Sequence, residues 1–338
     1  MNIYGISREK LEEYFVSINE KTFKAQQIFE WLYQKRVHTL EECSNIKKDV
    51  IAKMKKDFSL NQPMVLKREI DNDTEKFLFE LEDHERVEAV LMKHNYGNSV
   101  CVSSQVGCNM GCKFCESGRL KKVRNLGAHE MVGQILKIES VSGIRISSVV
   151  IMGIGEPLDN YENVIEFIKI INDAKGLAIG ARHITLSTCG IIPKISELAN
   201  LPLQINLAIS LHAPNSKLRS QIMPINKAYP LEELMSAIEA YIKKTNRRVT
   251  IEYVMLNGVN DKKEHALELA RLLRGKNVYV NLIPYNETSH IEFLKSDKKT
   301  IDRFYDTLTK EHINVTVRRE FGSKISAACG QLRSKESI

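Results

Sequence analysis

The sequence lacks the features that mark several large classes of protein. It has no low-complexity linker, no repeat of fixed period and no apolar run near the ~18 continuous residues that a membrane span requires. Its first residues, MNIYGISREKLEEYF, are charged and amphipathic, which does not fit a secretory signal peptide. A P-loop is missing, and GIGEP at residues 153–157 has only the first two glycines of a GxGxxG fingerprint. We therefore expect a cytoplasmic protein that acts without a membrane.

Cysteine is also scarce. The chain of 338 residues has seven, an odd number that does not fit a secreted disulfide framework and favours a reducing compartment. Three of them, Cys108, Cys112 and Cys115, stand together in VGCNMGCKFCESG with the spacing Cys-x3-Cys-x2-Cys. No fourth cysteine lies close by, which makes this spacing the most informative feature of the sequence.

Three thiolates in one loop do not complete the usual metal sites. A structural zinc ion takes four protein ligands, and an ordinary iron–sulfur cluster takes four thiolates. Three suit a [4Fe-4S] cluster with one iron left open, and Phe114 could shield such a cluster from water. The spacing matches that of the radical S-adenosylmethionine (SAM) enzymes, in which the open iron chelates SAM. The alternatives are three cysteines grouped by accident and a zinc site that borrows a distant histidine.

Composition and hydrophobic periodicity indicate how the chain is organised. With 43% hydrophobic residues it can bury one large core, and its net charge of +7 fits an anionic partner, although many metabolic enzymes are mildly basic. Residues 1–60 are predicted to form a helical accessory domain, with helices at 7–18, 23–37 and 40–58. The lysines of the last helix either contact RNA or form a solvated face. Residues 61–98 are predicted to form a connecting β-strand region.

Beyond residue 99 strand and helix patterns alternate. The predicted strands are at 99–105, 147–153, 183–188, 205–212, 248–256, 278–285 and 313–319, with helices at 129–140, 163–173, 230–244, 265–275 and 298–311. This alternation predicts a parallel sheet with right-handed crossovers, either a barrel or an open doubly wound sheet. Function should then lie at the carboxyl ends of the strands.

Polar residues gather at these predicted strand ends. In the GIGEP turn the glycines allow close backbone approach and Glu156 could bind the amino group of SAM, although any βα turn favours glycine and proline. Later strands end in Ser187 and Thr188, in Ser210, Leu211 and His212, and in Pro284, Tyr285 and Asn286. Four strands with such ends favour a polar ligand over four unrelated turns.

Two further cysteines stand out by their neighbours. Cys101 lies in the strand SVCVSS, and Cys329 lies among small residues in ISAACGQLRSK. On residue type alone each is interpreted as a buried apolar cysteine, as are Cys43 and Cys189.

The segments that point to a known family are the three-cysteine loop VGCNMGCKFCESG, called the cluster loop below, and GIGEP, ISLHAPN, MPIN, EYVML, VND, NLIPYN and AACGQL. With these segments, from about Arg86 to Leu332, the chain resembles the RlmN/Cfr family of radical-SAM RNA adenosine methyltransferases. The resemblance implies an α/β fold, a partial (β/α)6 radical-SAM barrel with an N-terminal helical extension and short connecting strands. Residues 99–338 would form its catalytic core, which ends in a loop that carries the methyl-carrying cysteine. The cofactors implied are a [4Fe-4S] cluster and SAM.

The resemblance also implies a role for each matching residue. The cluster ligands would be Cys108, Cys112 and Cys115. The SAM-binding positions would be Gly155, Glu156, Ser187, Ser210, Leu211, His212 and Asn286. The catalytic residues would be Cys329, which carries a methyl group, Cys101, which resolves a protein–RNA adduct, and Glu88 in RVEAV, which accepts a proton.

The chemistry of the family explains these parts. Carbon 2 of adenine is electron-poor and does not attack the methyl of SAM, so the methyl is first placed on the Cys329 thiolate. A radical generated from a second SAM removes hydrogen from that methyl, and the resulting carbon radical adds to the ring. Loss of a proton and attack by Cys101 on Cys329 would release methylated RNA and leave a disulfide.

The implied substrate is adenosine 2503 of 23S rRNA, with the adenosine that follows the tRNA anticodon as a second substrate. The rival within the family is methylation of C8 of the same rRNA base. A rival of another class is a radical-SAM enzyme that acts on a peptide or small molecule, and a non-enzymatic rival is an RNA-binding protein with a structural metal. We expect a monomer that receives electrons from a reductant such as flavodoxin or ferredoxin.

Basic residues flank the expected site. The target base must leave its pair and stack to react, and lysine and arginine would hold the adjoining phosphates. The residues are Lys121, Lys122, Arg124, Arg318, Arg319, Lys324, Arg333 and Lys335. The alternative is a set of scattered solvated charges.

Overall fold

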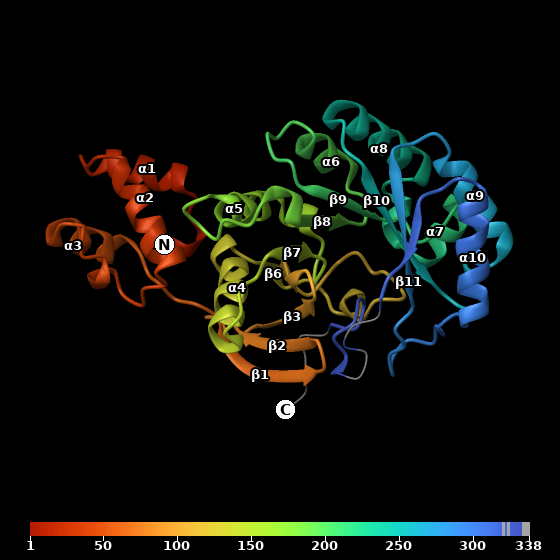
Figure 1. Ribbon diagram of the computed structural model, residues 1–338, viewed down its shortest axis with the longest axis horizontal. Coiled ribbons are helices and arrows are strands. Elements are labelled where there is room, and N and C mark those ends of the chain that lie inside the picture. The colour runs from red at the N-terminus through yellow and green to blue at the C-terminus, as the bar shows by residue number, and fades with distance from the viewer. Residues whose placement is uncertain (320–321, 323–324, 333–338) are drawn as a thin grey trace.

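The computed structural model describes residues 1–319, 322 and 325–332, and Figure 1 shows its path. Three of the basic residues singled out above, Lys324, Arg333 and Lys335, lie outside the described residues. Within them, no helix is long and apolar enough to cross a membrane.

Among the described residues, a ten-stranded sheet forms the centre of the molecule, and its strand order follows the chain. Its strands are β1 (Met64–Asp71), β2 (Thr74–Glu80), β3 (Arg86–His94), β4 (Gly97–Cys101), β7 (Ser148–Ile151), β8 (Ile184–Thr188), β9 (Asn206–Ser210), β10 (Val249–Met255), β11 (Val278–Pro284) and β12 (Val315–Val317). Strands β1 to β4 pair antiparallel, and each pair from β4 to β12 is parallel. A separate two-stranded sheet joins β5 (Gln105–Val106) to β6 (Arg124–Asn125).

This topology confirms the predicted partial barrel. The strands β4 and β7 to β11 are its six parallel strands, and the short β12 adds to their far edge. A doubly wound sheet would reverse its strand order near the middle, whereas here the order never reverses. The connecting strands β1 to β3 extend the sheet on the other side.

Helices cover the outer side of the parallel strands, and a second group forms a lobe at one end of the molecule (Figure 1). The lobe holds α1 (Arg8–Ser17), α2 (Phe23–Phe29) and α3 (Lys48–Asp57). The others are α4 (Ala128–Ser142), α5 (Tyr161–Asn172), α6 (Ile192–Leu198), α7 (Ser216–Ile222), α8 (Leu231–Thr245), α9 (Lys263–Leu273) and α10 (Lys298–Lys310). Their bounds follow local signals, for example Asp297, which accepts a hydrogen bond from Thr300 N at the start of α10.

Two helices predicted in the N-terminal lobe are wrong in extent. The helix expected at 23–37 changes after Phe29 into a π-helix, Glu30–Gln34, which keeps Leu32 and Tyr33 buried. The helix expected at 40–58 is a 3-10 turn, Leu40–Glu42, followed by α3, and a turn at Ser44 and Asn45 separates the two. The Asn45 side chain accepts a hydrogen bond of 2.6 Å from the Trp31 Nε1 group, which lies 14 positions earlier in the chain (45 − 31), and this contact holds the turn in place.

The lobe is joined to the barrel by polar contacts and by a shared core. Ser7 N donates to Glu166 Oε1 over 2.7 Å, and Arg8 Nε donates to Asp173 Oδ2 over 2.8 Å. Apolar side chains of α1 and α2 belong to the same hydrophobic cluster as those of α4 and α5. The lobe is therefore held against the barrel on the side of α4 and α5.

Candidate functional site

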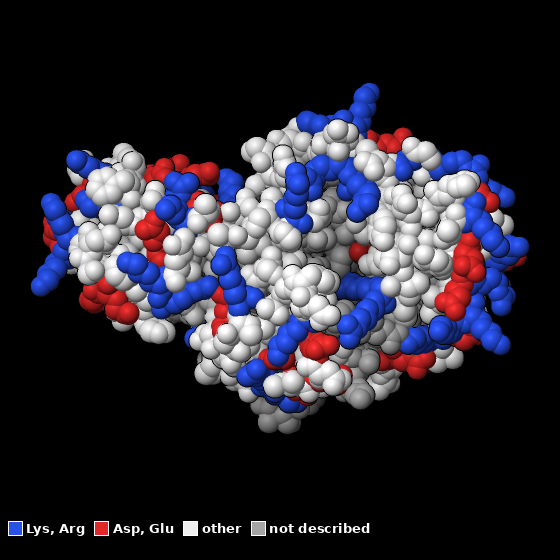
Figure 2. All heavy atoms as spheres, viewed as in Figure 1, with Lys and Arg blue, Asp and Glu red and all other residues white. Residues whose placement is uncertain are grey.

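A cavity of about 150 Å³ lies where the parallel strands end and the loop after β4 turns back. Among the residues that line it are Cys108, Cys112, Cys115, Gly155, Glu156, Ser187, Ser210, His212, Asn286 and Cys329. Figure 2 shows a face that is hollowed near its centre, with lysine and arginine side chains around the hollow. The structure thus brings together, at one edge of the sheet, residues predicted from separate parts of the sequence.

The three-cysteine loop is tight, and two glycines make it so. Gly107 has φ +73°, and a Cβ there would lie 2.2 Å from the carbonyl oxygen of Lys121. A Cβ on Gly118 would lie 2.7 Å from the carbonyl oxygen of Cys112. A larger residue at either position would push the backbone apart, so these glycines let the loop fold back on itself.

The three thiols sit in largely apolar surroundings. Burial raises the pKa of each, that of Cys108 to about 12, so the thiols stay protonated until a metal displaces the protons. Phe114 lines the same cavity, and its ring packs edge-on against His212 with centroids 4.9 Å apart. Among the described residues no three His, Cys, Asp or Glu side chains converge on a single metal ion. Three soft sulfur donors with an apolar cover fit an iron–sulfur cluster.

The GIGEP turn fixes a buried carboxylate at the cavity wall. Glu156 accepts backbone hydrogen bonds from Leu158 N at 3.0 Å and from Cys189 N at 2.8 Å. Gly155 has φ +108°, and a Cβ there would lie 2.6 Å from the side chain of Gln105. Burial raises the pKa of Glu156, while these hydrogen bonds oppose the rise and favour the carboxylate. The turn can therefore present a negative group to a cationic ligand such as an ammonium.

Neighbouring strand ends supply hydroxyl and imidazole groups. Ser187 Oγ and Ser210 Oγ lie 3.5 Å apart across β8 and β9. His212 Nδ1 accepts a hydrogen bond of 3.0 Å from Val254 N, and burial lowers the His212 pKa to about 3. The ring is therefore neutral with its proton on Nε2, which makes that nitrogen a donor. Leu211, which was predicted beside these residues, is fully buried and is not part of the cavity lining.

The loop that carries Cys329 is tied to the three-cysteine loop. Glu116 N donates to Gly330 O over 2.8 Å, and Ser117 Oγ donates to Leu332 O over 2.9 Å. On its other side, Asn286 Nδ2 donates to Cys329 O over 3.4 Å. These contacts place Cys329 over the cavity between the cluster loop and the end of β11.

A second, smaller cavity of about 50 Å³ contains Cys101. Cys329 lines both cavities, and so does Arg318, which follows β12. Burial and the nearby Cys329 raise the pKa of Cys101 to about 12. The structure thus places Cys101 and Cys329 around one space, where the charge of Arg318 opposes the rise that burial causes in the pKa of Cys101.

Glu88, the predicted proton acceptor, does not lie in the same cavities as Cys101 and Cys329. It is buried in β3, and its Oε1 lies 3.2 Å from Lys76 Nζ. Burial lowers the Lys76 pKa, but Glu88 and Glu69 together raise it above its usual value. Glu88 lines neither cavity, although it shares a face of β3 with Val90, the partner of Cys101.

Sequence reasoning missed Glu252 of β10 as a member of the site. This buried carboxylate lines the larger cavity and accepts a hydrogen bond of 2.8 Å from Asn281. Its main-chain oxygen also accepts hydrogen bonds from Leu211 and His212. The one available signal was an acid inside the otherwise apolar strand TIEYVML, where an unpaired charge is costly.

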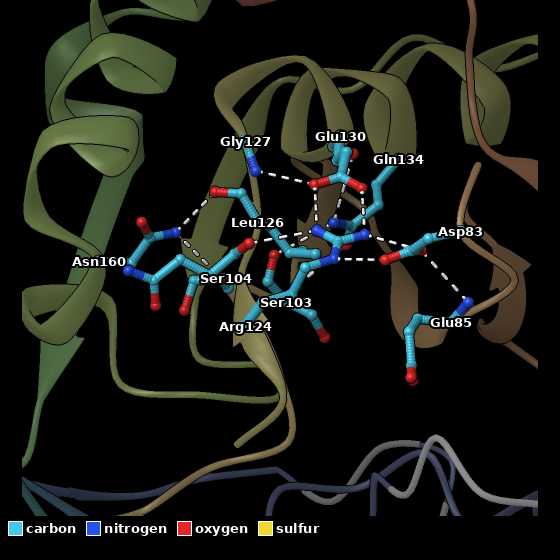
Figure 3. Close-up of polar contacts among 11 residues, drawn as sticks. Asp83, Glu85, Ser103, Ser104, Arg124, Leu126, Gly127, Glu130, Gln134 and Asn160 are labelled. Carbon is cyan, nitrogen blue, oxygen red and sulfur yellow. Dashed lines mark hydrogen bonds and ion pairs between the residues drawn. The ribbon is translucent and has the colours of Figure 1, made fainter.

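Two of the predicted RNA-binding cations, Lys122 and Arg124, make partly buried ion pairs within the protein, and a third, Arg319, makes an exposed one with Asp73. Lys122 Nζ lies 2.7 Å from Asp159. Arg124 makes two-pronged contacts with Asp83, at 2.6 and 2.9 Å, and with Glu130, at 2.8 Å for both oxygens (Figure 3). The Arg124 guanidinium therefore holds the end of the cluster loop against α4 and against the turn between β2 and β3. The interpretation of Arg124 as an RNA contact is corrected by this internal role.

Replacing Arg124 with glutamine should lower the free energy of unfolding by roughly 2 kcal/mol, because buried Glu130 would lose its charged partner. Arg124 also lowers the pKa of Asp83. That stabilisation is present above the unfolded pKa of Asp83 and is lost as pH falls through the folded value, so the difference between the two proteins should become smaller in acid. Urea unfolding at pH 7 and pH 3 measures both effects. Lys121→Gln, at an exposed position, is the control, and an equally small change of under ~0.5 kcal/mol in both variants would contradict the expectation.

Comparison with known proteins gives matches over almost the whole chain. Residues 1–60 match the family described as "Ribosomal RNA large subunit methyltransferase N-terminal domain", and residues 102–270 match the radical SAM superfamily. A protein of Enterococcus faecalis named "Probable dual-specificity RNA methyltransferase RlmN" is 54% identical, over 99% of this chain and 96% of its own length. A protein of Spiroplasma citri with the same name is 51% identical, over 99% of this chain and 97% of its own length.

A solved structure also matches. The crystal structure of a radical SAM methyltransferase from Sphaerobacter thermophilus superposes with a TM-score of 0.93 at 40% sequence identity. The match covers 99% of this chain and 100% of that one. The N-terminal lobe and the barrel therefore both have counterparts in that protein.

Proposed function

Because the chain belongs to the RlmN family of radical-SAM RNA methyltransferases, we propose that it methylates C2 of adenosine 2503 in 23S rRNA and of the adenosine that follows the tRNA anticodon. Relatives at 51–54% identity are named dual-specificity RNA methyltransferases, which supports two RNA substrates. The observation that carries the proposal is that Cys329 lines the three-cysteine cavity and also the cavity of Cys101. A methyl carrier and its resolving thiol must meet in this way.

Each group of residues has a part in the proposal. Cys108, Cys112 and Cys115 would hold a [4Fe-4S] cluster, which together with SAM supplies a radical able to take a hydrogen atom from a methyl group. The SAM-binding residues would be Gly155, Glu156, Ser187, Ser210, His212 and Asn286, with Leu211 acting through its buried backbone. The reductant, flavodoxin or ferredoxin, the monomeric state and the cytoplasmic location belong to the same proposal.

Four further residues have separate roles in the proposed reaction. The Cys329 thiolate attacks the methyl carbon of SAM, so that an S–CH3 bond forms as the bond to the SAM sulfur breaks. Arg318 lines both cavities, and its charge opposes the rise in the pKa of Cys101 and so favours the Cys101 thiolate. Glu88, held by Lys76, would accept the proton that leaves the adenine. Once the unpaired electron of the RNA adduct had been returned to the oxidised cluster, the Cys101 thiolate would attack the Cys329 sulfur. The S–CH2 bond would break, its electron pair and a proton would complete the methyl group on the RNA, and a Cys101–Cys329 disulfide would be left for a reductant.

Mass spectrometry of rRNA and tRNA nucleosides tests the proposal, comparing cells with and without the protein. Cells that carry it should contain 2-methyladenosine at both sites, and cells without it should contain unmodified adenosine. Detection of 8-methyladenosine would instead assign the C8 reaction. RNA that is unmodified in both cells would reject an RNA substrate and favour a peptide or small molecule.

A further inference from the structure

The turn between β3 and β4 carries an aromatic stack that the reaction above does not use. Tyr96 is 87% exposed, and its ring lies on that of His94 with centroids 4.8 Å apart and planes 10° apart. His94 is itself fixed, since its Nε2 lies 3.0 Å from Ser99 Oγ. The stack therefore presents a flat ring to solvent in a set orientation.

One face of β3 leads from the reactive cysteines to this stack. Alternate side chains of a strand share a face, so Val90, Met92 and His94 form one row. Val90 and Met92 line the smaller cavity together with Cys101 and Cys329. At about 3.4 Å per residue, His94 lies roughly 7 Å beyond Met92 along the strand. The stack thus lies just past the end of the cavity lining.

A positive charge lies between the cavity and the stack. Arg319 lines the smaller cavity, and its exposed guanidinium lies 3.4 Å from Asp73, whose carbonyl accepts a hydrogen bond from Lys93 N beside His94. Burial and the charges of Arg319 and Arg318 lower the pKa of His94, so its ring is neutral at pH 7. An exposed ion pair contributes at most about 1 kcal/mol, so a phosphate can replace Asp73 as the partner of Arg319.

We propose that Tyr96, backed by His94 and flanked by Arg319, is a stacking platform for an unpaired RNA base near the target adenosine. The inference rests on the proposed function, because it needs an RNA substrate whose target base enters between Cys101 and Cys329. Single-stranded RNA is commonly held by aromatic rings that stack its bases and by cations that hold its phosphates. Since every base has a flat face, the platform supplies affinity and register without reading sequence.

Binding of a stem–loop RNA that contains the target adenosine in its loop tests the platform. Tyr96→Ala should raise the Kd about tenfold, equivalent to about 1.4 kcal/mol, whereas Tyr96→Phe should stay close to wild type. The control is Tyr279→Ala, which removes an aromatic ring that lies 4.8 Å from Arg248 and lines neither cavity. Reductive SAM cleavage without RNA should be the same in all four proteins.

Abasic substitutions along the RNA loop identify the stacked base. At one position near the target, loss of the base should weaken binding to wild type about tenfold, yet leave binding to Tyr96→Ala unchanged. Equal Kd values for wild type and Tyr96→Ala would overturn the platform, as would abasic effects that are identical in both proteins at every position. Wild-type protein that neither binds nor methylates the RNA would overturn the proposed function itself, which distinguishes the two failures.

Discussion

Replacing Cys112 with alanine should leave the purified protein almost without iron and unable to cleave SAM reductively. The loop offers three thiols to one cavity, and the described residues contain no other group of three His, Cys, Asp or Glu side chains arranged to hold a metal ion. Losing one of three thiolates leaves two irons of a cubane without protein ligands, so the cluster should not survive purification. Iron analysis and the yield of 5′-deoxyadenosine under anaerobic, reducing conditions measure the two losses.

The matched control is Cys43→Ala. Cys43 is buried in the N-terminal lobe and lines neither cavity of the site. It should keep the wild-type iron content and SAM cleavage. A Cys112→Ala protein that forms 5′-deoxyadenosine at the wild-type rate would disprove the cluster assignment, and zinc in place of iron in the wild type would favour a structural metal site.

The variants Cys329→Ala and Cys101→Ala should fail at different steps. Without Cys329 there is no thiolate to accept a methyl group, so neither protein nor RNA should become methylated. Without Cys101 the carrier still works, but the bond between Cys329 and the RNA has no thiol to break it. The Cys101→Ala protein should therefore purify with RNA attached, which intact-protein mass spectrometry before and after nuclease treatment measures.

The different outcomes expected for the two variants distinguish a chemical role of these cysteines from a packing role. Both cysteines border the smaller cavity, so a purely structural role would make the two variants alike, each somewhat less stable than wild type. A Cys101→Ala protein that carries no RNA and keeps full activity would leave Cys101 as a packing residue. The double variant should carry no RNA, because the attachment passes through Cys329.

Much of the fold was predictable because its signals are local. The apolar periodicity of segments such as 230–244 and 248–256 fixes their helix or strand type whatever they pack against. Prediction failed where a long-range contact decides, as at Asn45, whose bond to Trp31 interrupts a helix-like pattern. Nothing in the sequence indicated that α2 continues as a π-helix after Phe29 either.

Those residues of the candidate site that belong to recognisable motifs could be predicted from the sequence. The spacing of the three cysteines carries its own chemistry, whereas the proximity of Cys101 and Cys329 followed only from a family resemblance, since 228 positions separate them (329 − 101). Isolated charges were the hardest to interpret. Lys122 and Arg124 read as RNA contacts but make ion pairs within the protein, while Glu252 proved to line the cavity. A charged residue shows its partner only once the chain is folded.

The two hydrogen bonds from the cluster loop to the Cys329 loop have a consequence for biosynthesis. Glu116 and Gly330 are 214 positions apart (330 − 116), and a ribosome adding roughly 5–20 residues per second takes on the order of 10–40 s to make that stretch. During that interval the three thiols exist without the loop that later covers them. Machinery that delivers iron and sulfide can therefore reach the nascent chain from the side that the last residues close.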